Sequence, residues 1–258
     1  MRLTIKHQEH YSRGELLLRS IFGFFYIALP HLFCLIFLGM WGNILRFITF
    51  WIILFTGEYP KSFFDFQLGL LRWNTRVNAR LYNLTDGYPP FGLNAHDDYV
   101  NLEVKYPENV SRGLTLVRFL FGGFYVGLPH IFVLYFVFIA VSFVNMLAFW
   151  VVLFTGKYPE SWHRFVTGFL RWNLRVSLYL NYMTDDYPPF SGKPDPEEFE
   201  VETPTIEAPA PAAAAAPKPA PETPPAPETP KPDASSDSGD SAAEGDTSTD
   251  ESDEPKKD

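Results

Sequence analysis

The chain has 258 residues and a net charge of −9, and its single cysteine, Cys34, excludes a scaffold held by internal disulfides. Charge is distributed unevenly. Residues 1–190 carry 16 Lys and Arg against 12 Asp and Glu, whereas residues 191–258 carry 5 against 18. The acidic C-terminal part argues against nucleic-acid binding, which needs a basic surface.

A short alternating segment, RLTIKH, occupies residues 2–7, and a similar one, NLEVKYP, occupies residues 101–107. Alternation of apolar and polar residues is typical of a β-strand. We therefore predict two short strands that pair with each other.

The next element is an apolar block at residues 16–55, in which Arg19 and Arg46 are the only charged residues. About 20 apolar residues suffice for one membrane-spanning helix. The block is therefore long enough for a helical hairpin, and Gly39–Asn43 supplies turn residues. A second block at residues 115–154 contains only one charge, Arg118. We predict one hairpin in each block, either spanning the bilayer or re-entrant.

A different interpretation makes residues 13–29 a surface helix and Pro30 the first residue of one long span ending at Phe55. Proline is favoured at that position. This interpretation places Arg46 in hydrocarbon, which is costly, and it inverts one repeat relative to the other. Basic residues flank both ends of each block, and such residues prefer the cytoplasm. We therefore favour hairpins, with both termini cytoplasmic, in a multi-pass membrane protein.

An amphipathic helix is predicted after each apolar block. Gly57 suits a helix end, and Pro60 and Pro159 are each expected at the first position of the new helix. An apolar stripe and a row of basic residues then run along separate faces, which is typical of a helix lying in the membrane interface. Anionic lipids or a membrane or cytoplasmic protein partner are the expected ligands. The candidate residues are Arg72, Trp73, Arg76, Arg80, Arg171, Trp172 and Arg175.

Two Pro-His pairs, Pro30-His31 and Pro129-His130, lie within the apolar blocks. Proline leaves a backbone carbonyl one turn earlier without its helical partner. We expect a neutral imidazole to donate to that carbonyl; a helix-kink site that lines a transport path is the alternative. No metal-ligand spacing, catalytic motif or cofactor motif is found, so we expect no metal, no cofactor and no enzymatic activity.

The two halves repeat each other at an offset of 99 residues, which aligns residues 12–91 with residues 111–190 without a gap. Asn74 and Asn173 occupy equivalent positions and are expected to form hydrogen bonds between helices. The predicted organisation has four parts: repeat 1 (1–91), a linker (92–99), repeat 2 (100–190) and a disordered acidic tail rich in Pro and Ala (191–258). Low apolar content in the tail leaves too little burial to offset the entropy of ordering.

The shared pattern runs Ser-Arg-Gly, Leu-Pro-His, Phe-Thr-Gly-x-Tyr-Pro, Arg-Trp-Asn-x-Arg and Tyr-Pro-Pro-Phe. It resembles the bacterial membrane family called domain of unknown function 4389, in two tandem copies. The resemblance implies an integral membrane protein of a bacterium and brings no established activity, so it supplies no catalytic residues. Tyr179 of copy two stands at the position of Arg80 in copy one, so the two copies are not equivalent there.

Together these observations predict an all-α integral membrane protein. Each repeat would combine a helical hairpin with an interfacial amphipathic helix, preceded by a short β-strand. The expected role is a non-enzymatic scaffold or accessory subunit that engages the lipid bilayer or a protein partner; self-association into an oligomer is compatible with the sequence. The alternative is a component of a transporter or channel, with the repeats framing a path near the Pro-His sites.

Overall fold

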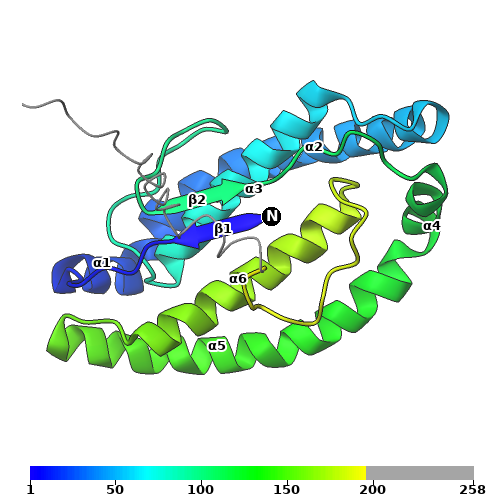
Figure 1. The fold of residues 1–258 in the computed structure, drawn as a ribbon. Coiled ribbons are helices and arrows are strands. Elements are labelled where there is room, and N and C mark those ends of the chain that lie inside the picture. The colour runs from blue at the N-terminus through cyan, green and yellow to red at the C-terminus, as the bar shows by residue number, and fades with distance from the viewer. Residues whose placement is uncertain (196–258) are drawn as a thin grey trace, which may run out of the picture. The chain divides into compact units, whose positions relative to one another are not determined.

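The computed structural model describes residues 1–195, so most of the predicted tail, residues 196–258, lies outside the described residues. The described part is mostly helical, with two short strands (Figure 1). Its elements are β1 (Arg2–Ile5), α1 (Arg13–Gly23), η1 (Phe24–Ala28), α2 (Leu29–Thr56), α3 (Lys61–Leu81), β2 (Val100–Glu103), α4 (Arg112–Gly122), η2 (Gly123–Gly127), α5 (Leu128–Thr155) and α6 (Glu160–Leu180).

The first apolar block forms one continuous helix from Arg13 to Thr56, in which η1 is a single π-helical turn between α1 and α2. The predicted turn at Gly39–Asn43 is wrong, because this segment lies inside α2. Gly42 serves packing instead: a Cβ atom there would lie 2.8 Å from the Leu70 side chain on α3. The interpretation with Pro30 at the start of a long helix is the closer one, since Pro30 lies in the first turn of α2.

In each repeat the chain turns after the long helix and not within the apolar block. Gly57 ends α2 in the left-handed conformation with φ +80°, and Gly156 ends α5 in the same way with φ +73°. Pro60 and Pro159 precede α3 and α6 as their N-cap residues, one position earlier than predicted. α3 then packs back along α2, and α6 packs along α5.

The two strands pair as predicted, in an antiparallel sheet. Leu3 lies opposite Leu102, and these two residues occupy equivalent positions of the two repeats, 99 residues apart. Because equivalent residues face each other there, the sheet places a pseudo-two-fold axis between Leu3 and Leu102.

The long helices run antiparallel and meet at both ends (Figure 1). At one end, the Tyr11 backbone N–H donates to the Gly156 carbonyl at 2.8 Å; at the other, the Val110 N–H donates to the Gly57 carbonyl at 2.9 Å. The N-terminal arm of each repeat therefore caps the long helix of the other repeat. This inverted relation follows from a single continuous helix in each copy.

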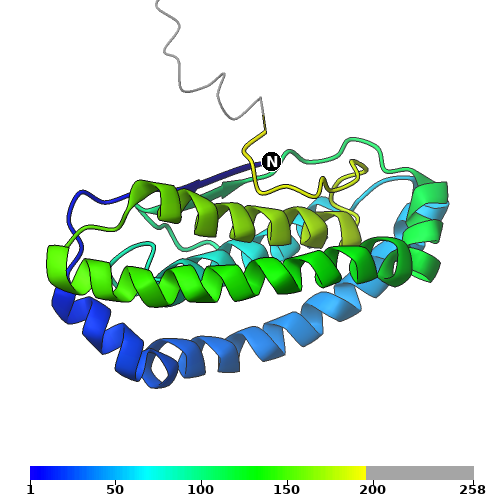
Figure 2. The same cartoon turned by 90° about the horizontal axis from the view of Figure 1, so that it is seen from below.

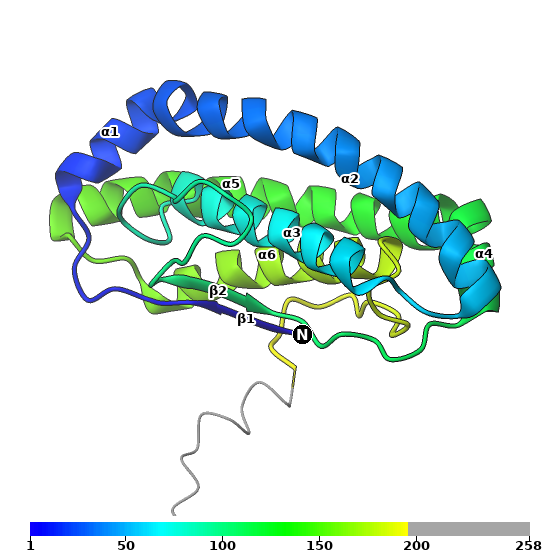
Figure 3. The same cartoon turned by 90° about the horizontal axis from the view of Figure 1, so that it is seen from above.

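The helices are layered. α3 and α6 lie between the long helices and the sheet (Figures 2 and 3). Leu3, Ile5, Val100 and Leu102 are buried, whereas Asn101 and Glu103 on the opposite face of the sheet are exposed. One side of the described part is thus polar, and the other side carries the long apolar helices.

In each repeat, a buried arginine of the first helix forms an ion pair with an aspartate. Arg19 on α1 contacts Asp86 at 2.9 Å, and Arg118 on α4 contacts Asp185. The same aspartates accept from the backbone N–H of Ser12 and of Ser111, the N-cap residues of α1 and α4. The aspartates thus cap and anchor a helix in each repeat.

Candidate functional site

At each Pro-His site, one backbone carbonyl lacks its usual helical donor, because proline has no N–H. Pro30 cannot donate to the carbonyl of Tyr26 four residues earlier, and the Tyr88 hydroxyl donates to that oxygen instead, at 3.0 Å. In repeat 2 the Tyr187 hydroxyl donates to the Tyr125 carbonyl at 3.2 Å. The expectation that the imidazole fills this role is therefore wrong: the tyrosine of the Tyr-Pro-Pro-Phe segment does so.

The histidines join the long helix to the helix that packs on it. His31 Nδ1 accepts from the Trp73 indole N–H at 2.8 Å, and His130 Nδ1 accepts from Trp172 at 2.9 Å. An indole nitrogen can only donate. Each imidazole is therefore held in the neutral form that carries its proton on Nε2.

Both histidines are completely buried, and a phenylalanine of the same repeat stacks on each ring, with centroids about 4 Å apart. A cavity of about 600 Å³ lies between the two repeats, and neither histidine is among the residues that line it. Their position favours a structural link within each repeat over a transport path at the kinks.

The predicted basic residues of α3 and α6 are largely buried. Arg76 is 2% exposed and donates to the carbonyls of Gly92 and Ala95, within the predicted linker. Arg175 is 7% exposed and donates to the carbonyls of Ser191 and Lys193 at 2.9 and 2.7 Å. The first residues of the predicted tail are thus held against α6.

Arg72 and Arg171 connect the repeats. Arg72 on α3 donates to the Leu102 carbonyl of β2 at 2.8 Å, and Arg171 on α6 donates to the Leu3 carbonyl of β1 at 3.2 Å. Each helix therefore binds the strand of the other repeat, next to the pseudo-two-fold axis.

Arg80 completes the basic row and forms an ion pair with the buried Asp97 at 2.9 Å. These arginines therefore face protein carbonyls and carboxylates, which differs from the predicted exposed face for lipid phosphates. The tryptophans between them, Trp73 and Trp172, are buried as well. The physical reason lies in the two strands and the segments after α3 and α6, whose backbone carbonyls cover the basic face.

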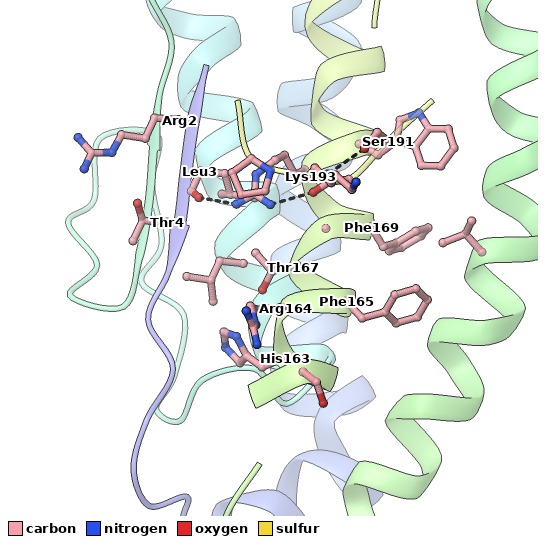
Figure 4. Close-up of a pocket in the computed structure, with 18 of the residues that line it drawn as sticks. Arg2, Leu3, Thr4, His163, Arg164, Phe165, Thr167, Phe169, Ser191 and Lys193 are labelled. Atoms are coloured by element: carbon pink, nitrogen blue, oxygen red, sulfur yellow. Dashed lines mark hydrogen bonds between the residues drawn. The ribbon is translucent and has the colours of Figure 1, made fainter. Parts of the chain in front are cut away.

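A cavity of about 690 Å³ lies beside Arg171, between β1, α6 and residues 190–194. Figure 4 shows His163 and Thr167 of α6 on the side of β1, whereas Phe165 and Phe169 point away from it. Burial, together with the nearby His7, lowers the pKa of His163 to about 4, and this imidazole hydrogen-bonds the Leu84 carbonyl at 3.2 Å. The repeat 1 residue at the equivalent position is Phe64.

A second cavity, of about 600 Å³, lies between the repeats, with walls from α2, α3 and α6 and one residue of α5. Its lining contains no charged residue. Leucines and phenylalanines supply its apolar part, and six amides supply its main polar groups. The amides are Asn43, Gln67, Asn74, Asn78, Asn173 and Asn181.

The orientation of these amides is set by helix carbonyls. The side-chain N–H groups of Asn43, Asn173 and Asn181 donate to the carbonyls four residues earlier on their own helices, at 2.7–3.0 Å. Gln67 donates to the Gly42 carbonyl of α2 at 2.6 Å. A backbone carbonyl can only accept a hydrogen bond, so each of these amides uses its N–H there and its oxygen is left as an acceptor.

Only part of this cavity could be predicted from the sequence. Asn74 and Asn173 were expected to bond between helices, but Asn173 donates within α6 and Asn74 accepts from Asn78 on α3. The usable signal is the step of four residues, which places Asn173, Ser177 and Asn181 on one face of α6.

The comparison with known proteins follows the repeat boundaries. A family described as Domain of unknown function (DUF4389) matches residues 14–92 and 115–192. No curated protein and no solved structure matches the chain. Because the two matched stretches make up more than half of the chain, the protein belongs to the DUF4389 family and contains two tandem copies of its domain.

Proposed function

We propose that the protein is a non-enzymatic scaffold or accessory subunit embedded in a membrane, the bacterial inner membrane being the expected one, and that it engages lipid through its two long helices. The observation that carries the proposal is the exposed apolar surface of these helices. In each, large apolar side chains remain exposed from the first turns to the last. Examples on the first helix are Phe22, Phe33, Phe37, Trp41, Phe47 and Phe55.

Exposure of this extent needs an apolar environment. Contiguous apolar patches on soluble monomers rarely exceed a few hundred Å². Arg13–Thr56 and Arg112–Thr155 are each long and apolar enough to cross a membrane. Exposed Trp41, Trp51 and Trp150 add residues that prefer the membrane interface. Lipid contact by these helices accounts for all of these features.

Helix length favours helices that lie along the membrane. A helix of 44 residues is about 66 Å long, about twice the thickness of the hydrocarbon core. Its exposed apolar residues extend along nearly all of this length, so an upright helix would leave many of them in water. We propose that both long helices lie in the plane of one leaflet, with the polar face of the sheet toward water.

This topology differs from the predicted hairpins. Those hairpins required a turn inside each apolar block, but α2 continues as a helix through Gly39–Asn43. With helices in the plane, both ends of each long helix lie on the same side of the bilayer.

The topology can be tested with single cysteines at Glu9 and Glu58, which flank the first long helix and are exposed. In a Cys34→Ser background, each variant is reconstituted in sealed vesicles and treated with a maleimide that cannot cross the membrane. Both cysteines should react from the same side. Labelling from opposite sides would show that the helix crosses the bilayer and would reject the in-plane proposal.

Membrane engagement itself is tested by flotation with vesicles. The wild-type protein should float with vesicles and need detergent in their absence. Phe33→Asp combined with Phe132→Asp, on the exposed faces of α2 and α5, should lower the floating fraction severalfold, because a charge in hydrocarbon costs several kcal/mol. Asn101→Asp on the polar face of β2 is the matched control and should float normally. A wild-type protein that stays monomeric in buffer and does not float would refute the function.

A further inference from the structure

The cavity between the repeats is a candidate ligand site that the proposed function does not explain. The antiparallel long helices contact the opposite repeat at both of their ends, while α3 and α6 lie between them and the sheet. The cavity of about 600 Å³ is lined by α2, α3 and α6, together with Phe138 of α5. This volume suits a small molecule or the polar part of a lipid.

The polar groups in this cavity are mainly acceptors. The amide oxygens of Asn43, Asn173 and Asn181 have no hydrogen-bond donor among residues 1–195. Gln67 is 7% exposed, and its oxygen likewise has no donor partner within this range. A ligand that brings N–H or O–H donors would satisfy them.

A smaller set of donors complements these acceptors. The Asn74 amide nitrogen and the Tyr82 hydroxyl also line the cavity, and neither donates to another residue in the part of the chain that the structure describes. They provide donors for an anionic oxygen of the ligand. The cavity therefore offers partners for both halves of a zwitterion.

The lining contains no charged side chain, which restricts the class of ligand that fits the cavity. A ligand with a net charge would lose hydration without a compensating partner, which is unfavourable. A zwitterion carries no net charge, and its own two charges lie close together.

We infer that this cavity binds the headgroup of a zwitterionic phospholipid with a primary ammonium group, the phosphatidylethanolamine class. The ammonium group donates to the free amide oxygens, and the phosphate accepts from Asn74 and Tyr82. The acyl chains follow the apolar side chains of the long helices into the leaflet. This inference rests on the proposed membrane embedding.

The headgroup chemistry separates this lipid from its competitors. A choline headgroup is also zwitterionic, but its trimethylammonium group has no N–H to donate. A phosphatidylglycerol headgroup has hydroxyl donors, but it brings a net negative charge that the lining does not neutralise. A preference for the ethanolamine headgroup therefore depends on the amide oxygens that lack a donor.

The test uses the full-length protein in nanodiscs with equal amounts of phosphatidylethanolamine, phosphatidylcholine and phosphatidylglycerol, followed by native mass spectrometry of the retained lipids. The wild type should retain the ethanolamine lipid about tenfold more than either competitor, as expected for one or two net hydrogen bonds. Asn173→Leu combined with Asn181→Leu should abolish this preference, because leucine keeps the shape and removes the acceptor.

Asn101→Leu on the exposed face of β2 is the matched control and should retain the preference. Equal retention of the three lipids by the wild type would overturn the inference, as would a preference that survives the double substitution in a variant with wild-type thermal stability. Vesicle flotation separates the two proposals: a protein that floats but shows no headgroup preference loses only this inference, whereas a protein that does not float loses the proposed function as well.

Discussion

The two repeats share the contacts that hold each of them together and differ at the cavity between them. Both repeats have the histidine–tryptophan bond, the tyrosine that fills the carbonyl freed by proline, and an arginine that binds the other repeat's strand. All of these contacts depend on fixed distances between elements, so the same residue types recur at equivalent positions.

The cavity lining is unequal. Asn43, Gln67 and Asn78 of repeat 1 correspond to Ser142, Val166 and Ser177 of repeat 2. Only Asn74 and Asn173 form an equivalent pair, and the other four amides have no amide at the equivalent position of the other repeat. The scaffold is thus pseudo-symmetric, whereas the lining of the cavity is not.

A second difference between the repeats lies near the C-terminal ends of α3 and α6. Arg80 forms an ion pair with Asp97, whereas Tyr179 at the equivalent position hydrogen-bonds the Tyr125 hydroxyl at 2.9 Å and lies against the guanidinium of Arg118. Two different chemistries thus fill one position. The contact to be satisfied is set by the neighbouring segment rather than by the helix itself.

The largest loss of stability is expected from the buried arginines that hold the segments after α3 and α6. Arg76→Met and Arg175→Met each remove a buried guanidinium and leave two part-buried carbonyls without donors, and we expect a loss of about 4 kcal/mol in either repeat. Thermal unfolding in detergent measures the loss. A large effect in one repeat alone would contradict the equivalence of these contacts.

His163 predicts a dependence on pH that has no counterpart at Phe64, the equivalent position of repeat 1. Its pKa is about 4 in the folded protein and about 6.5 when unfolded, so the unfolded state binds the proton more readily. Stability should be unaffected by this group above pH 6.5 and should fall by up to about 3 kcal/mol between pH 6.5 and pH 4.

His163→Phe copies Phe64 of repeat 1 and should remove this part of the acid dependence. Unfolding curves of both proteins at pH 7.5 and pH 4.5 make the comparison. An unchanged difference between the two pH values would assign the acid sensitivity to another group.

The histidine–tryptophan bonds should be equally important in both repeats. Trp73→Phe and Trp172→Phe remove the donor to a buried imidazole while keeping an aromatic ring, and each should lower the free energy of unfolding by about 2 kcal/mol. A tryptophan-to-phenylalanine change at the exposed Trp41 controls for the loss of ring size. If either buried variant behaves like that control, the bond is unimportant in that repeat.

The smallest effect is expected where each repeat caps the long helix of the other. Arg13 donates to the Phe154 carbonyl at 3.0 Å, and Arg112 donates to the Thr56 carbonyl at 2.9 Å. Both arginines are exposed, so Arg13→Ala and Arg112→Ala should each cost about 0.5 kcal/mol. The free energy of unfolding of the double variant should show simple addition, because the two caps lie at opposite ends of the frame.

Local chemistry made several features predictable. The alternating segments form paired strands, and Gly57 ends the first long helix. The 99-residue repeat and the resemblance to the DUF4389 family hold for the same reason, because they are properties of the chain itself.

Other features depended on contacts that no local pattern contains. Gly42 looks like a turn residue until Leu70 and Gln67 of α3 pack against it. The basic stripe of α3 looks like a surface for lipid phosphates until the linker carbonyls and the β2 strand cover it. In both cases a segment distant in sequence reverses the meaning of a local signal.

The sequence by itself determined that two short strands pair, that two long apolar helical stretches form, and that the pattern occurs twice. Only the tertiary structure decided that each apolar block is one continuous helix, that the basic residues face inward, and that amide oxygens gather between the repeats. Helix formation and hydrophobicity are set by residues close along the chain, whereas burial and partner choice are set by which distant segments meet.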